Sequence, residues 1–302
     1  AAFATGVLTQ RVQTWSIASA TLALMASTAL GPLLFNWLPW WPELHWQWLP
    51  ILVLFAGTTG LVPALSQQFP QFRVKPGESV FKPLGLVRLV SILVIAGLTA
   101  YLLVPDWQRL DNVRVWYVVG LASVIFIVSC LSSYGVQRSE PALPALLLFS
   151  TGLAVGILLF LSGSLKFAQL AGLPTAAGAA WWLLAGRSRL TSDSLAVAAP
   201  AFIAVITGLL FCGYINSFSS LPVACYAIVV LAPASLGLRA VRRTGLARES
   251  ISGNHQQIDR QESANQVRIS AQEKNRFGWW SHFLPLAVAL VWAITVSVME
   301  DS

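Results

Sequence analysis

Five polar residues where one apolar stretch ends and the next begins form the part of this sequence best suited to binding a solute. They are Ser162, Ser164, Lys166, Gln169 and Thr175, and Pro174 stands among them. Transporters often build binding sites within the bilayer from polar side chains beside helices that proline interrupts. We therefore predict a substrate-binding site here. The alternative is an ordinary turn whose lysine extends its ammonium group to the membrane surface, followed by a tightly packed helix.

Residues suited to catalysis, metal binding or redox chemistry are sparse. The three histidines, His45, His255 and His282, are far apart in the sequence, and the three cysteines lie in apolar runs without CxxC spacing. No GxSxG, HExxH or P-loop motif is present. His45, which precedes a tryptophan, is either an axial ligand or an interfacial residue without a function. We expect no catalytic residue, no metal site and no cofactor, and we favour a function other than catalysis.

Ionisable residues inside the apolar segments would be costly in lipid, and they therefore mark ion pathways where they occur. Here every Asp and Glu falls between the apolar segments or at their ends. This pattern disfavours a carrier that couples transport to protons or sodium through carboxylates. It does not argue against a permease for neutral solutes.

The elements that position these residues are predicted to be membrane-spanning helices. Of the 302 residues, 56% are hydrophobic and only 10% are charged, against about 25% charged in soluble domains. Apolar runs of membrane-spanning length recur along the chain, and lipid leaves the helix as the only spanning structure for continuously apolar segments. We predict an all-α, polytopic bundle forming a single membrane domain over 1–302. Its nine predicted spans are about 15–37, 48–66, 86–104, 114–136, 142–162, 168–185, 195–215, 220–239 and 280–298.

The first predicted span resembles a signal peptide over residues 11–30, with one arginine before an apolar stretch and small residues. The apolar character continues through Phe35, which makes the segment long enough to cross a bilayer. We therefore expect an uncleaved first helix.

The distribution of positive residues predicts the orientation. If the N-terminus is cytoplasmic, all 19 Lys and Arg residues except Arg109, Arg114 and Lys166 lie on the inner side. Positive loops resist translocation, so this asymmetry favours an inner N-terminus and an outer C-terminus. The net charge of +7 then reflects cytoplasmic loops, and we expect no nucleic-acid partner. A helical bundle of this kind is expected in the bacterial inner (cytoplasmic) membrane.

Tryptophans gather at the predicted membrane surfaces, where indole places an apolar ring and one N–H donor. The segment 37–50 is the densest example and falls at the outer ends of the first two spans. An aromatic cage for a quaternary ammonium ligand is the alternative for this segment. The residues predicted to anchor the chain at the membrane surfaces are Trp37, Trp40, Trp41, Trp46, Trp48, Trp279 and Trp280.

The segment 240–278 is predicted to be a cytoplasmic polar loop, either a solvated linker or partly disordered, because it is rich in Gln, Ser and Arg. An arginine cluster at its start is expected to attract anionic lipid headgroups, although a simple stop-transfer anchor is the alternative. These arginines are Arg239, Arg242, Arg243 and Arg248.

Helix packing is predicted at Gly152 and Gly156, which form a GxxxG pattern in the fifth span. Small residues let helix backbones approach closely in lipid.

Two functions remain open. The first is a permease that moves a neutral or weakly polar small solute through a water-filled cavity reaching Ser162–Gln169. The second is a non-catalytic subunit of a larger membrane complex, with a filled core and an exposed apolar or Gly-lined flank. The expected partners are the lipid bilayer and, in the second case, other membrane subunits.

Overall fold

The structure, a computed structural model, describes residues 20–28, 42, 44–66, 83–106, 111–187, 190–217, 221–242 and 282–300. Within these ranges the ordered elements are all helices, and no strand occurs. The predicted all-α class is therefore confirmed. The elements are a helical segment at 20–28, η1 (His45–Trp48), α2 (Leu49–Ser66), α3 (Pro83–Leu103), α4 (Asp111–Gln137), α5 (Ala142–Leu161), α6 (Leu165–Gly186), α7 (Ser192–Ile215), α8 (Val223–Leu231), a further helix Ala234–Arg242, and α11 (Leu284–Glu300).

Several of these helices are long and apolar enough to cross a membrane. Within the described residues there are four, and their apolar parts are Gly85–Leu103, Asn112–Gln137, Ala142–Leu161 and Ser192–Ile215. Counting Val223–Leu231 and Ala234–Arg242 as one bent span gives five. These helices indicate a membrane-embedded protein.

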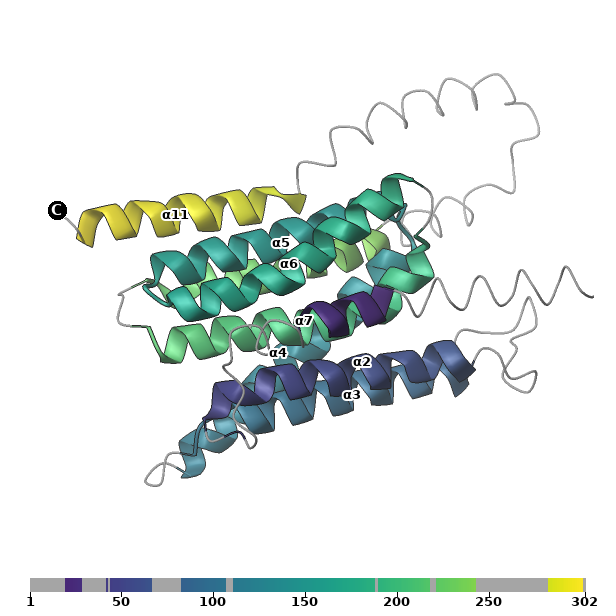
Figure 1. Cartoon of the computed structure of the whole chain (residues 1–302), viewed down its shortest axis with the longest axis horizontal. Helices are drawn as coiled ribbons and strands as arrows, with labels where there is room; N and C mark the ends of the chain where they lie inside the picture. Colours follow the sequence, from purple (N-terminus) through teal and green to yellow (C-terminus); the bar gives the residue numbers. More distant parts are fainter. Residues whose placement is uncertain are drawn as a thin grey trace, which may run out of the picture.

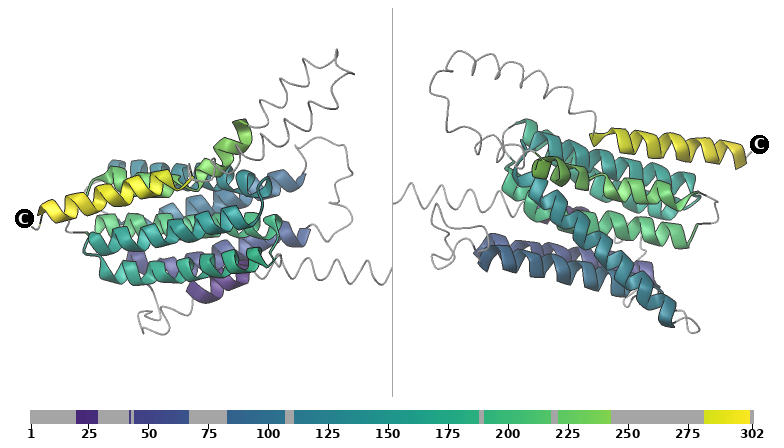
Figure 2. Two further views of the ribbon diagram at one scale, coloured as in Figure 1. Left: turned by 90° about the horizontal axis from the view of Figure 1, so that it is seen from above. Right: turned by 180° about the vertical axis from the view of Figure 1, so that it is seen from behind.

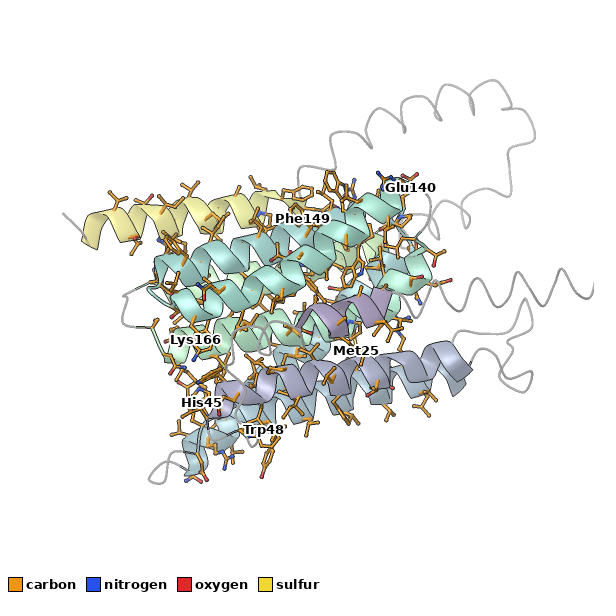
Figure 3. The ribbon with its side chains drawn as sticks, in the orientation of Figure 1. Met25, His45, Trp48, Glu140, Phe149 and Lys166 are labelled. Atoms are coloured by element: carbon orange, nitrogen blue, oxygen red, sulfur yellow. The ribbon has the colours of Figure 1, made fainter. Side chains whose placement is uncertain are left out.

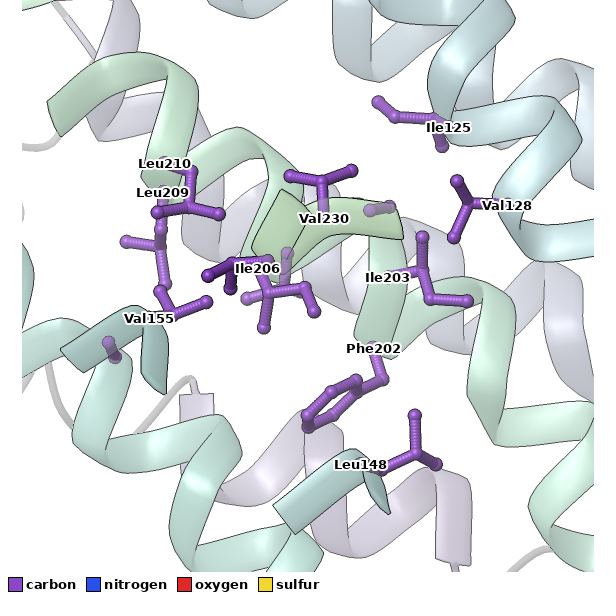
Figure 4. Packing of buried hydrophobic residues seen from close by; sticks show 14 of the residues in the cluster. Ile125, Val128, Leu148, Val155, Phe202, Ile203, Ile206, Leu209, Leu210 and Val230 are labelled. Atoms are coloured by element: carbon purple, nitrogen blue, oxygen red, sulfur yellow. The ribbon is translucent and has the colours of Figure 1, made fainter. Parts of the chain in front are cut away.

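Helix α7 is the centre of the bundle, and 89% of its apolar stretch is buried. Figure 1 shows it between α2 and α3 on one side and α5, α6 and α11 on the other. Figure 2 shows α11 running along the outside of the bundle, where it contacts α5 and α8. The side chains of α7 interdigitate with those of its neighbours, and Figure 4 shows Phe202 beside Leu148 of α5 and Ile203 near Val128 of α4.

Helices α5 and α6 pack closely at glycines. A Cβ added to Gly152 would lie 2.7 Å from Oγ1 and 3.1 Å from Cα of Thr175, and one added to Gly178 would lie 2.9 Å from Cα of Phe149. Gly156 has more room, since its added Cβ would meet nothing closer than 3.9 Å. Of the two glycines predicted to pack, Gly152 thus stands at the tight crossing and Gly156 beside it.

Prolines affect these helices in two different ways. Helices α6 and α7 continue through Pro174 and Pro200. The sequence predicts one span over 220–239, but the structure breaks it into α8 and Ala234–Arg242, which are inclined by 53°. Pro233 lies at the break, where it lacks the N–H that would continue the helical hydrogen bonds. The bonds from Ser235 N to Ala232 O (3.1 Å) and from Leu236 N to Pro233 O (3.3 Å) turn the chain here.

Candidate functional site

The hydroxyl groups of the predicted polar site are bonded to main-chain carbonyls. Ser162 Oγ donates to Leu159 O (2.8 Å), and Thr175 Oγ1 donates to Ala171 O (2.6 Å), both within the local helical turn. Ser164 Oγ lies 3.4 Å from Gly213 O and so joins the start of α6 to the end of α7. A solute that used these hydroxyls as donors would have to displace these bonds.

Lys166 and Gln169 are exposed on the first turns of α6. The Lys166 ammonium lies over the indole of Trp46, 3.9 Å from the ring centroid. The same indole meets Phe167 edge to face, with centroids 6.1 Å apart. These contacts hold η1 against the beginning of α6. They lie at the end of the bundle where Figure 3 places His45, Trp48 and Lys166, and Glu140 lies at the other end.

His45 extends this contact to α7. Its Nε2 lies 3.4 Å from Nδ2 of Asn216, and the same amide nitrogen donates to Cys212 O at 2.7 Å. Because Nδ2 is a donor, His45 Nε2 is the acceptor and the ring is neutral. Partial burial lowers the pKa of His45 from its usual range, which favours the same neutral form. A small pocket of about 30 Å³ lies nearby, lined by residues that include Trp46, Leu170 and Val205.

A larger hollow lies between α4, α7 and α8, away from the predicted polar residues. It is an open groove with a cavity volume of about 510 Å³, within the range of small-molecule sites. We call it the lateral groove. Its lining consists of Trp116, Tyr117, Gly120, Leu121, Val124, Thr207, Leu210, Phe211, Tyr214, Val223, Tyr226, Ala227, Val230 and Leu231.

The lateral groove has an aromatic rim and a nearly apolar floor. Tyr117 and Phe211 pair across α4 and α7 with centroids 6.3 Å apart, and Tyr214 and Tyr226 pair across α7 and α8 at 5.4 Å. Trp116 is 76% exposed at the mouth. No Asp, Glu, Lys or Arg belongs to the lining, so the groove offers nothing to compensate the cost of desolvating an ion.

Thr207 is the exception on the floor of the lateral groove. Its side chain is 3% exposed, and Oγ1 is buried without a hydrogen-bond partner. Thr151 and Thr175, by contrast, donate to the carbonyl four residues earlier, at 2.7 Å and 2.6 Å. A buried hydroxyl left without a partner costs about 1–3 kcal/mol, so each such group calls for an explanation.

The arginines predicted to bind headgroups are only partly described. Arg239 Nη1 lies 3.0 Å from His282 Nε2, and His282 Nδ1 lies 2.9 Å from Ser235 Oγ. Because arginine only donates, Nε2 carries no proton and Nδ1–H donates to the serine. Arg242 is exposed at the end of its helix, whereas Arg243 and Arg248 lie outside the described residues.

The tryptophans predicted to anchor the chain are also only partly described. Trp46 and Trp48 are half-buried in η1. The others, Trp37, Trp40, Trp41, Trp279 and Trp280, lie outside the part of the chain that the structure describes, as does nearly all of the predicted loop 240–278. In the described part no cluster of three His, Cys, Asp or Glu side chains is arranged to hold a metal ion.

Comparisons with family models, with curated proteins and with solved structures find no match to this chain. The class of protein therefore follows from the structure alone: it is an all-helical bundle with several apolar helices of membrane-spanning length. The sequence reasoning did not find the lateral groove. Thr207 is one hydroxyl in a long apolar run, and Trp116 is a typical interfacial tryptophan, so neither pointed to a site by its pattern alone.

Proposed function

We propose that this protein is a permease-like membrane protein that moves a neutral or weakly polar small solute, and that the lateral groove is its binding site. The observation that carries the proposal is the 510 Å³ groove, which has an aromatic rim, no charged lining and one buried hydroxyl without a partner. A cavity of this kind favours an uncharged molecule with few polar groups. No carboxylate relay is required for such a solute.

The proposal includes nine spans, a cytoplasmic N-terminus, an outer C-terminus and a bacterial inner membrane. The distribution of Lys and Arg supports this orientation. In this arrangement the groove opens in the outer half of the bilayer, because α4 starts and α7 ends on that side. Lys166, Trp46 and His45 then lie at the outer surface, and Arg239 and His282 lie near the inner one.

The polar residues Ser162, Ser164, Lys166, Gln169 and Thr175 have a secondary place in this proposal. Ser164 joins α6 to α7, which lines the groove, and Lys166 joins α6 to η1. A carrier must change these contacts as it opens to the other side. We therefore expect them to affect the rate of transport more than the affinity for solute.

The test is uptake of radiolabelled neutral aromatic alcohols and amides into proteoliposomes. Transport is separated from passive permeation by saturation and by acceleration when unlabelled solute is present on the far side. Gly120→Leu is expected to abolish saturable uptake, since Gly120 lines the groove and its added Cβ meets no atom within 4 Å. The matched control is Gly97→Leu on α3, where the Cβ also meets open space but outside the groove.

Lys166→Ala in the same assay tests the predicted polar site. Unchanged uptake would remove Lys166 from the proposal. If no member of the panel shows saturable uptake, the permease proposal is wrong.

The second candidate is a non-catalytic subunit of a larger membrane complex. It is favoured by the filled centre of the bundle, where 89% of the apolar stretch of α7 is buried, and by the exposed apolar face of α4, where only 22% of the apolar stretch is buried. A partner helix packed on α4 would protect Val115, Val119 and Ile127, all now exposed, from a lipid-soluble photoreactive label. Equal labelling of these positions in native membranes and in lipid vesicles would argue against a partner there.

A further inference from the structure

The structure points to a particular class of molecule for the lateral groove. We infer that it binds a compact, neutral, ring-containing molecule with one hydroxyl or carbonyl group, and that this group hydrogen-bonds to Thr207 Oγ1. The inference deepens the proposed function, because it names the kind of solute that the same groove takes.

The position of Thr207 defines where the polar group of the ligand must lie. Tyr214 stands at the rim, and Thr207 lies about 10 Å deeper along α7, given a rise of 1.5 Å per residue. The ligand therefore carries its polar group at the end that enters first, and its apolar part faces the aromatic rim.

This geometry discriminates between a compact molecule and a membrane lipid. A lipid chain that entered from the outer surface would leave its headgroup at the mouth and bring only methylene groups to Thr207. The hydroxyl would then remain unsatisfied. A ring-containing molecule with one polar atom pairs with the hydroxyl and also offers a flat face to the aromatic side chains of the rim.

Thr207 and Gly120 both line the groove. Helices α4 and α7 are antiparallel, since Tyr117 packs near Phe211 at one end and Ser133 Oγ lies 3.3 Å from Ala196 O at the other. Gly120 is therefore level with Thr207. Its missing side chain leaves the wall open at the depth of the hydroxyl, so a leucine there would occupy the place of the ligand.

The experiment compares two probes of similar shape, β-naphthol and naphthalene. Equilibrium dialysis measures their binding to the full chain in lipid nanodiscs, with empty nanodiscs as the blank. We expect the wild type to bind β-naphthol about tenfold more tightly than naphthalene, the factor typical of one net hydrogen bond. Thr207→Val should remove this preference and leave naphthalene binding unchanged, and Thr207→Ser should retain it.

The Gly120 and Gly97 variants test whether the probes bind in the lateral groove, and the Thr207 variants test the hydrogen bond. Gly120→Leu should abolish binding of both probes, and Gly97→Leu should change neither. Equal binding of the two probes by the wild type, or a preference that survives in Thr207→Val, would overturn the inference about the polar group. Binding of both probes that is unaffected by Gly120→Leu would overturn the groove as the site. Tight, Thr207-dependent binding without saturable uptake would refute the permease proposal and leave this inference standing.

Discussion

The ammonium group of Lys166 lies 3.9 Å from the centroid of the Trp46 ring and thereby ties the start of α6 to η1, more than a hundred residues earlier. Such a contact contributes about 0.5–1 kcal/mol at an exposed position. It also links the predicted polar site to the tryptophan-rich segment, two features that the sequence presents separately.

The first prediction concerns this pair. A double-mutant cycle with Lys166→Met and Trp46→Leu should give a coupling of about 0.5–1 kcal/mol, since each change alone removes the same cation–π contact. Reversible unfolding in mixed detergent micelles measures it. Lys166→Arg is the control and should keep most of the coupling, because a guanidinium also stacks on indole. Additive single effects would show that the contact contributes nothing to stability.

The second prediction concerns the close approach of α5 and α6. Gly152→Ala should destabilise the protein by about 1–3 kcal/mol, because the new Cβ would lie 3.1 Å from the backbone of Thr175 and force the helices apart. Gly156→Ala is the matched control, since it adds the same methyl group where the nearest atom is 3.9 Å away. Unfolding midpoints measured side by side check the difference. Equal effects of the two substitutions would contradict the packing argument.

The third prediction is a pH dependence at His45. Because burial lowers the pKa of the folded state's imidazole, the unfolded chain binds this proton more readily. The full stability is therefore present above about pH 7 and declines as the pH falls below the ordinary histidine pKa of about 6.5. His45→Gln, which cannot be protonated, should show a smaller loss on acidification. Parallel unfolding curves at several pH values measure this, and identical pH profiles for the two proteins would exclude His45 as the cause.

The fourth prediction concerns the buried His282, which is 2% exposed and joins α11 to the helix Ala234–Arg242. His282→Leu should cost about 2–3 kcal/mol, because it leaves the guanidinium of Arg239 without this acceptor. Pairing the change with Arg239→Met should recover part of the loss, since both polar partners are then removed. Hydrogen exchange of the amides of α11 measures the effect, and α11 should exchange fastest in the single variant and at an intermediate rate in the double variant. Exchange unaltered by His282→Leu would mean that the contact does not hold α11.

Much of the helical architecture follows from the sequence, because continuous apolar runs in lipid have only one way to satisfy their backbone groups. The predicted range 142–162 and helix α5 (Ala142–Leu161) differ by a single residue at one end. Proline was less informative: α6 and α7 continue through Pro174 and Pro200, whereas the chain bends by 53° at Pro233. Whether neighbouring groups hold the helix together at a proline depends on contacts between distant segments.

The sequence alone determined that this chain is apolar, helical and suited to a membrane, and it located the stretches that form helices. Only the tertiary structure decided which helix lies at the centre and where a ligand fits. Helices α4 and α7 are nearly equally apolar, yet 22% of the apolar stretch of α4 is buried, against 89% for α7. Lipid is as apolar as a protein core, so hydropathy does not distinguish a helix that faces lipid from one that packs inside. The lateral groove is the space that α4, α7 and α8 leave between them, and the sequence of no single helix predicts that space.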